Sequence, residues 1–227
     1  MITVYYAASP NVFKILIALE ELGFSYEKHT VNLRRGAQFE PEFLAISPNN
    51  RVPAIIDHEP VGGGEPVSVF ESGAILLYLA EKADKLLPQD MRQRTEVYSW
   101  MMWQMAGQGP MLGQLGHFRN YAKEKLPYAI DRYHKEGKRL YGVLDRRLEH
   151  RDYIIGDSLS MADIICWPWI LFRTQHDMDL ADYPNLSRWF TFLEARPTFV
   201  RALDGYVVSE PPQFDDLARK NLFGLTV

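Results

Sequence analysis

Ser9 and Asn11 are the first residues of this chain whose types and position could do chemistry. They lie in the segment Ser-Pro-Asn-Val at 9–12, between a strand-like run at 2–6 and a strongly helical run. The free N–H groups and partial positive charge of a helix N-terminus stabilise anions, and a thiolate there has a lowered pKa. Redox turns of the Cys-x-x-Cys type use such a position, but neither 9 nor 12 is cysteine. The two polar residues predict either helix capping or hydrogen-bond donation to an anion.

Val52-Pro53 is a second candidate, in the run NNRVPAII at 49–56. Proline is tolerated at the first position of a strand. A cis bond here would leave the N–H and C=O of Val52 pointing outward, where they could pair with a peptide-like ligand as an added strand does. The alternative is an edge-strand proline that binds nothing.

Glu71-Ser72 is a third candidate, in the run VFESG at 69–73, where a strand again passes into a helix. The Ser72 hydroxyl and the free helix N–H groups can hold a carboxylate. Glu71 can hold an ammonium group. Together they suit the α-amino-acid end of a zwitterion, although an acid in a first helical turn is also common for capping alone.

The other residues with reactive side chains give weaker evidence of a functional role. Cys166 is the only cysteine, so no internal disulfide can form, and its apolar surroundings favour core packing. His117 has no partner at metal-ligand spacing, so no metal is expected. Tyr5 and Tyr6 precede the first turn, and their place on the strand fits sheet packing better than catalysis.

The composition is that of an ordinary globular protein. The chain has 227 residues, 47% hydrophobic and 24% charged, with a formal net charge of −4. There is no basic patch with interleaved aromatics, so nucleic-acid binding is not expected. The N-terminus has no signal-peptide pattern, and the longest apolar run, 164–172, is too short to cross a bilayer. We therefore expect a cytoplasmic protein that binds neither nucleic acid nor membrane.

The elements that must position these residues alternate between strand and helix over 1–86. The hydrophobic spacing predicts strands at 2–6, 25–33, 52–57 and 66–70, and helices from about 10 to 22, at 38–46 and at 71–83. Gly23 ends the first of these helices. The order βαβ, short helix, ββα predicts a small mixed sheet with helices on its faces.

From about residue 92 the pattern is helical. Long helices are predicted at 92–106 and 127–149, and the four glycines and Pro110 between 107 and 118 predict a kink or break. Further helices begin at a capping box of Ser160 and Asp163 and run from 183 to 197. We therefore expect domains at 1–86 and 92–205, followed by an extension, 206–227, packed over the body.

Taken together, these motifs resemble the glutathione transferase superfamily. Its members have an α/β thioredoxin-like N-terminal domain with "VP" before the third strand and "ES" at the next helix, then an all-α domain with an "S-x-x-D" helix start. The runs SPNNRVPAIID, FESGAILLYLAEK, GQGPMLGQ and YAIDRY resemble its bacterial Nu class more closely. That class uses a Thr or Ser and an Asn near the first helix start, as Ser9 and Asn11 stand here.

The resemblance implies glutathione as cosubstrate, with one or two molecules, or the disulfide, in each site. Ser9 and Asn11 would be catalytic, donating hydrogen bonds to the glutathione sulfur. Gln38 would contact the glycine end, Val52 the cysteine backbone, and Glu71 and Ser72 the γ-glutamyl end. Arg132 would bind a carboxylate of the second molecule from the partner subunit of a homodimer. The implied glutathione-binding residues are Asn11, Gln38, Arg51, Val52, Pro53, Glu71, Ser72 and Arg132.

The activity implied is reduction of a small-molecule disulfide by glutathione, with no protein cysteine involved. The glutathione thiolate attacks the disulfide, and a second glutathione resolves the mixed disulfide. Conjugation of glutathione to electrophiles is an alternative, because the same thiolate could perform it. A regulatory protein that binds glutathione without turnover is a third.

Overall fold

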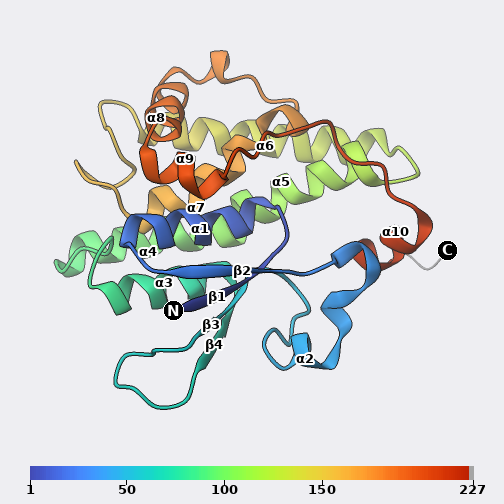
Figure 1. Ribbon diagram of the computed structural model, residues 1–227. Coiled ribbons are helices and arrows are strands. Elements are labelled where there is room, and N and C mark those ends of the chain that lie inside the picture. The colour runs from blue at the N-terminus through green and yellow to red at the C-terminus, as the bar shows by residue number, and fades with distance from the viewer. Residues whose placement is uncertain (225–227) are drawn as a thin grey trace. The chain divides into compact units, whose positions relative to one another are not determined.

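The structure is a computed structural model that describes residues 1–224. The chain divides into two compact units, each with its own core (Figure 1). Of the described residues, unit 1 comprises 1–84 and the tail at 212–224, and unit 2 comprises 85–211. The tail therefore contributes to the first unit, although it follows the second in sequence.

Unit 1 contains a four-stranded mixed sheet in the order β2-β1-β3-β4. β1 pairs in parallel with β2 and antiparallel with β3, and β3 pairs antiparallel with β4. This is the mixed α/β sheet that the sequence predicts. Its strands are β1 (Ile2–Tyr6), β2 (Tyr26–Thr30), β3 (Ala54–Asp57) and β4 (Val67–Phe70). Its helices are α1 (Pro10–Leu22), α2 (Pro41–Leu44), α3 (Ser72–Ala83) and α10 (Asp216–Phe223), with 3₁₀ turns η1 (Leu33–Arg35) and η2 (Ala37–Phe39).

Helix α1 follows from local signals at both of its ends. Ser9 is its N-cap, and Pro10 occupies the first helical position, where a missing N–H costs nothing. Gly23 is the C-cap at φ 73°, a left-handed conformation that glycine adopts without strain. The residues at 12–19 are all buried, so α1 is a core helix. This packing fixes the N-terminus of α1 relative to the sheet.

Helix α10 packs on the turn formed by η1 and η2, within unit 1. Asp215 caps it, and its Oδ2 also pairs with Arg35 Nη2 at 3.1 Å. The Arg34 guanidinium lies 5.1 Å from the centre of the Phe214 ring. The predicted C-terminal extension therefore contains a helix, and that helix packs on the sheet-bearing unit.

Unit 2 contains helices, turns and loops, with no β-strand among its described residues. Its α-helices are α4 (Met91–Trp103), α5 (Gly109–Gly116), α6 (Pro127–Arg147), α7 (Met161–Leu171), α8 (Pro184–Glu194) and α9 (Pro197–Leu203). The shorter turns are the π-helical η3 (Gln104–Gln108) and η4 (His117–Tyr121) and the 3₁₀ turns η5 (Arg173–His176) and η6 (Leu180–Asp182). The predicted capping box is confirmed, since Ser160 and Asp163 cap α7 reciprocally.

The glycine-rich segment is not a break in the helix, as the sequence had suggested it could be. Two π-helical turns flank α5 and keep the backbone helical. A Cβ at Gly113 would lie 3.5 Å from the Trp169 ring, and one at Gly116 would lie 3.6 Å from His176 Nε2. Both distances are ordinary van der Waals contacts, so the continuity of the helix rests on the π-helical turns and not on a need for glycine at these positions.

Pro197 also acts differently from the expectation. The helix predicted to reach it ends at Glu194, and Pro197 occupies the first position of the next helix, α9. Proline suits that position because its φ is preset and its missing N–H has no intrahelical partner there. The sequence pattern therefore located a helix boundary at Pro197 but missed α9 beyond it.

Candidate functional site

The three candidate motifs meet at one edge of the sheet in unit 1. In the register of β1 and β3, Tyr5 is opposite Ala54, and in that of β3 and β4, Ala54 is opposite Phe70. Ser9 follows the end of β1, Pro53 directly precedes β3, and Glu71 directly follows β4. The strand pairing therefore brings to one place three segments that are separated in the sequence by up to 62 residues.

Ser9 caps α1 and keeps its donor capacity. Its Oγ accepts from the Val12 N–H at 3.4 Å, and its backbone carbonyl accepts from the N–H of Val12 and Phe13. A hydroxyl accepts and donates at once, so capping does not use up its proton. Asn11 lies half-buried in the first turn. Capping and anion binding are thus compatible in one geometry.

The loop before β3 carries a cis peptide bond between Val52 and Pro53. Val52 lies two residues before Ala54, the first residue paired with β1, so its backbone is outside the sheet ladder. The Ser47 hydroxyl donates to the Arg51 carbonyl at 2.8 Å and holds the loop from within. Arg51 itself is exposed. The backbone of Val52 is therefore available to an extended ligand.

Glu71 and Ser72 have contrasting environments at the start of α3. Glu71 is the N-cap at φ 70° and is exposed, and its Oε1 accepts from Asn49 Nδ2 at 3.1 Å. Ser72 is the first helical residue and is 4% exposed. Its Oγ accepts a hydrogen bond of 3.2 Å from Nζ of the buried Lys14, on α1. Neither Asn49, which lies in the run at 49–56, nor Lys14, which lies in the apolar part of α1, was predicted as a site residue.

Gln38 is buried beneath the C-terminal helix. It is 1% exposed, and its Nε2 donates to the Asn221 carbonyl at 2.9 Å. That contact fixes the orientation of the amide, because a flipped Oε1 would face another acceptor. Gln38 Oε1 is buried and has no hydrogen-bond partner among the described residues. The amide thus holds an unused acceptor, which matches an N–H of a ligand.

Arg132 belongs to α6 of unit 2, whereas the other predicted residues belong to unit 1. Its side chain is exposed, and its charge helps to lower the pKa of Glu136, one turn further along the same helix, after the larger effect of Arg139. Glu136 is thus a partner for Arg132 on the surface of α6, and the predicted role of Arg132 in binding a second glutathione stays a prediction.

The remaining reactive residues pack within their units. The Tyr5 ring lies 4.9 Å from the His29 ring and 5.6 Å from Phe43, and burial, with a smaller contribution from Glu27, raises its pKa. Cys166 is fully buried in α7. Within residues 1–224 no group of three metal-ligating side chains occurs, and no helix is long and apolar enough to cross a membrane.

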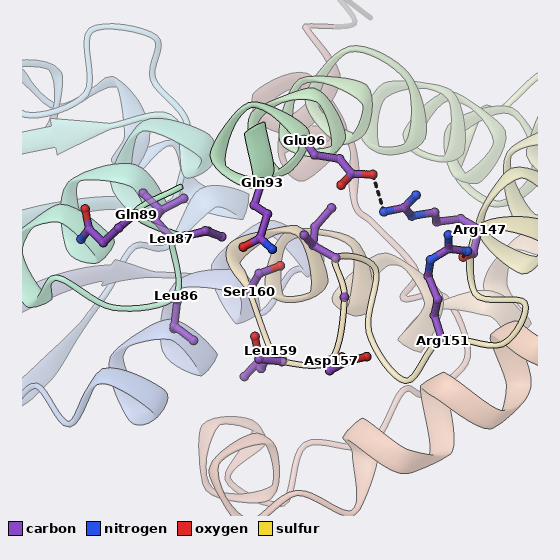
Figure 2. Close-up of a pocket in the computed structure, with 14 residues that line it drawn as sticks. Leu86, Leu87, Gln89, Gln93, Glu96, Arg147, Arg151, Asp157, Leu159 and Ser160 are labelled. Carbon is purple, nitrogen blue, oxygen red and sulfur yellow. Dashed lines mark hydrogen bonds and ion pairs between the residues drawn. The ribbon is translucent and has the colours of Figure 1, made fainter. Parts of the chain in front are cut away.

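A separate pocket of about 540 Å³ lies within unit 2 (Figure 2). The start of α4, the end of α6 and the loop before α7 line it, and Gln93 and Ser160 face each other across it. Arg147 Nη2 pairs with Glu96 at 2.5 Å, and Arg147 Nε donates to the Ile154 carbonyl at 2.7 Å. This cation is thus satisfied within the unit, and none of the predicted site residues lines the pocket.

Comparison with known proteins matches both units. The family model "Glutathione S-transferase, N-terminal domain" matches residues 1–81, and "Glutathione S-transferase, C-terminal domain" matches 112–197. The chain is 50% identical, over 203 residues, to the disulfide-bond oxidoreductase YfcG of Escherichia coli, covering 89% of this chain and 94% of that one.

Two solved structures are similar in both sequence and fold. A glutathione transferase from Burkholderia graminis, with two glutathione molecules bound per subunit, has a TM-score of 0.84 at 43% identity and covers 90% of this chain and 88% of its own. A glutathione transferase from Pseudomonas putida, with one glutathione disulfide bound per subunit, has a TM-score of 0.83 at 39% identity, covering 90% and 91%.

Proposed function

This chain belongs to the glutathione S-transferase family, and we propose that it is a glutathione-dependent disulfide-bond oxidoreductase. Glutathione is the cosubstrate, bound as two molecules or as the disulfide in each site, as in the two solved relatives. The N-terminus of α1 faces its thiol. The binding residues are those that the sequence predicts at the edge of the sheet.

The observation that carries this proposal is the absence of a usable protein thiol. Residues 9 and 12 are Ser and Val, and the one cysteine of the chain, Cys166, is fully buried in the other unit. Disulfide exchange needs a thiolate as nucleophile. In this protein that thiolate has to arrive with the substrate, and α1 supplies the positive end that stabilises it.

Different residues of the site bind different parts of the glutathione molecule. The Ser9 hydroxyl and the Asn11 amide donate to the sulfur, together with the free N–H groups of α1, and favour the thiolate over the thiol. The Val52 backbone pairs with the cysteinyl residue as a short added strand. Ser72 and the α3 N-terminus hold the γ-glutamyl carboxylate, and Glu71 holds its ammonium group.

The reaction balances with two glutathione molecules. The thiolate of the first attacks one sulfur of the substrate disulfide, so an S–S bond forms to glutathione and the other substrate sulfur leaves as a thiolate. The thiolate of the second attacks the glutathione sulfur of this mixed disulfide and releases the remaining substrate thiol. The products are glutathione disulfide and two substrate thiols, so the substrate gains two electrons and glutathione loses two.

Arg132 completes the proposal for the second glutathione. We assign it to a carboxylate of that molecule, contributed by the partner subunit of a homodimer. An exposed guanidinium suits such a carboxylate, which it can bind through two parallel hydrogen bonds. Within the family we place the chain in the bacterial Nu class, on its Ser9 and Asn11, and in the cytoplasm, where glutathione is kept reduced.

The direct test is reduction of hydroxyethyl disulfide by glutathione, measured beside conjugation of a dinitrobenzene electrophile. The variants are Asn11→Ala and Cys166→Ala. We expect reduction to fall at least about tenfold in Asn11→Ala, the loss of one hydrogen bond to a charged sulfur, and to survive in Cys166→Ala. Equal activity of Asn11→Ala and the unsubstituted protein would remove Asn11 from the mechanism, and inactivity of a folded Cys166→Ala would require a protein thiol.

The same assay separates the alternatives. Conjugation without disulfide reduction would make the protein a detoxifying transferase, because the thiolate would then attack carbon. Tight glutathione binding with neither activity would make it a binding or regulatory protein. The 50% identity to a disulfide-bond oxidoreductase favours reduction over both.

A further inference from the structure

Lys14 is a lysine inside the core of unit 1. It is 1% exposed and lies in the run of buried residues at 12–19 of α1. Its Nζ donates to Ser72 Oγ at 3.2 Å. Lysine is almost never fully buried, since removing an ammonium group from water costs far more than burying an apolar side chain. A lysine at such a position therefore points to a function.

The position of Lys14 connects the two helix N-termini of the site. Asn11 and Lys14 are three residues apart on α1, so they are neighbours on one face of that helix. Ser72 is the first residue of α3, at the end where the free N–H groups lie. The hydrogen bond from Lys14 thus joins the thiol end of the site to its carboxylate end.

The chemistry of this contact favours a negatively charged ligand group. A serine hydroxyl accepts through its lone pairs and donates through its proton, so Ser72 can accept from Lys14 and donate to a ligand through the same oxygen. A hydroxyl polarised by an ammonium is a stronger donor. In addition, the positive charge acts through protein rather than water, where its field is less screened. A carboxylate beside Ser72 gains from both effects, whereas an ammonium beside Ser72 would be repelled.

We propose that Lys14 is a positioning residue that acts through Ser72 Oγ to select ligands with a carboxylate at the γ-glutamyl end. This inference rests on the proposed function, because it assumes that Ser72 holds that carboxylate. Lys14 itself touches neither the sulfur nor the substrate disulfide. It should therefore affect the affinity for glutathione and leave the rate at saturation unchanged.

The test compares glutathione with two analogues. Glutaryl-Cys-Gly keeps the carboxylate and lacks the ammonium group, whereas 4-aminobutyryl-Cys-Gly keeps the ammonium group and lacks the carboxylate. We expect Lys14→Met to weaken the binding of glutathione and of glutaryl-Cys-Gly about tenfold and to leave 4-aminobutyryl-Cys-Gly unchanged. We also expect the KM for glutathione to rise by the same factor, with kcat unchanged. Met fills nearly the same space without the charge.

Lys82→Met is the matched control. Lys82 is another largely buried lysine of unit 1, with a side chain 13% exposed, and it pairs with Asp57 at the far end of α3. Its loss removes a charge and an ion pair without touching Ser72. Any general effect of lost stability on binding should appear equally in this variant, and we expect none of the three ligands to bind differently.

A double-mutant cycle tests whether Lys14 acts through Ser72. In the Ser72→Ala background, Lys14→Met should add little to the loss of glutathione affinity, because the hydroxyl through which Lys14 acts is already absent. Additive effects of the two substitutions would overturn the role through Ser72. Equal weakening of all three ligands in Lys14→Met, or of none, would overturn the carboxylate selection. Failure of the unsubstituted protein to bind glutathione would instead refute the proposed function.

A second measurement covers the case in which Lys14→Met does not fold. NMR of lysine ζ-nitrogens in the unsubstituted protein observes buried ammonium groups, and the Lys14 signal is identified through its contact with Ser72. Glutathione and glutaryl-Cys-Gly should both shift that signal, and 4-aminobutyryl-Cys-Gly should not. A signal that responds to all three ligands alike, or to none, would contradict the proposal.

Discussion

Gln38 Nε2 donates a hydrogen bond of 2.9 Å to the backbone carbonyl of Asn221, which lies 183 residues further along the chain. The Asn221 side chain adds a second contact, because its Nδ2 donates to the Arg34 carbonyl at 3.0 Å. A Cβ at Gly36 would lie 3.3 Å from the same Nδ2. Helix α10 thus fixes the turn that carries a predicted glutathione-binding residue.

Asn221→Asp should weaken glutathione binding. The new carboxylate would face the Arg34 carbonyl without a proton to donate, so α10 would loosen and Gln38 would lose its fixed orientation. A loss of about 1 kcal/mol in the free energy of glutathione binding predicts a KM for glutathione about fivefold higher, with kcat unchanged. Steady-state kinetics with varied glutathione checks this.

Leu217→Ser provides the control for that prediction. Leu217 lies on the same helix but is 47% exposed, so its replacement leaves the contact with the turn intact. A lower KM in Asn221→Asp would show the opposite relationship, in which α10 shields Gln38 from glutathione.

Asn49 orients Glu71, and its replacement should raise the KM for glutathione. In Asn49→Ala the Glu71 carboxylate loses one exposed hydrogen bond, worth about 0.5–1 kcal/mol, so a two- to fivefold increase is expected. In Asn49→Asp the two carboxylates would repel, so the increase should be larger. The order of the two variants, measured at low salt, is the test, since equal KM values would remove Asn49 from the orientation of Glu71.

The elements that the sequence predicted correctly carry their signals locally. Strand β1, the end of α1 at Gly23 and the capping box of Ser160 and Asp163 each depend on a few adjacent residues. The segments predicted to form the active site also depend on a few adjacent residues, and strand pairing brings them to one edge of the sheet. Local chemistry and strand order were therefore enough to propose the site.

The features that the sequence could not supply depend on distant partners. In the sequence, Lys14 is a single polar residue within an apolar stretch of helix. Its proposed role in ligand binding becomes visible only through its contact with Ser72 on α3. The packing of α10 on the turn at Gln38 joins residues that are separated in the sequence by the whole of unit 2. The glycines of α5 suggested a break because glycine and proline favour breaks locally, whereas the π-helical turns that keep the backbone helical have no local sequence signal.

Asp163 should be the most sensitive single position for the stability of unit 2. Its Oδ1 accepts from the Ile154 N–H at 2.8 Å and from Trp189 Nε1 at 2.9 Å, and its Oδ2 accepts from the N–H and Oγ of Ser160, both at 3.0 Å. It is fully buried. Asp163→Ala would leave these donors buried without a partner, which predicts a loss of at least about 3 kcal/mol in the free energy of unfolding.

Urea unfolding of two further variants grades this effect. Asp163→Asn keeps the acceptor at Oδ1 and places a donor opposite Ser160, so it should fall between the unsubstituted protein and Asp163→Ala. Ser160→Ala removes one capping oxygen and should cost about 1 kcal/mol. A Ser160→Ala variant as unstable as Asp163→Ala would show that the cap, and not the four-donor network, determines the stability.

His176 should make the protein less stable in mild acid. It is 5% exposed, its Nδ1 is buried without a partner among the described residues, and its ring stacks on Trp169 at 6.2 Å. Burial, helped by the nearby charge of Arg119, lowers its pKa to about 4. The unfolded chain binds a proton near pH 6.5 and the folded protein only near pH 4, so protonation favours unfolding between these values. Stability is complete above pH 6.5 and falls by about 3 kcal/mol as the pH reaches 4.

His176→Phe should remove that part of the pH dependence, because phenylalanine can stack on Trp169 but does not titrate. The measurement is the free energy of unfolding in urea at pH 7, 5.5 and 4.5, compared between variant and unsubstituted protein, so that other titrating groups cancel. His150→Asn is the control, since its imidazole is 93% exposed and asparagine tolerates its φ of 57°. A His176→Phe variant that loses stability in acid as steeply as the unsubstituted protein would mean that His176 takes up its proton in the folded state at its ordinary pKa.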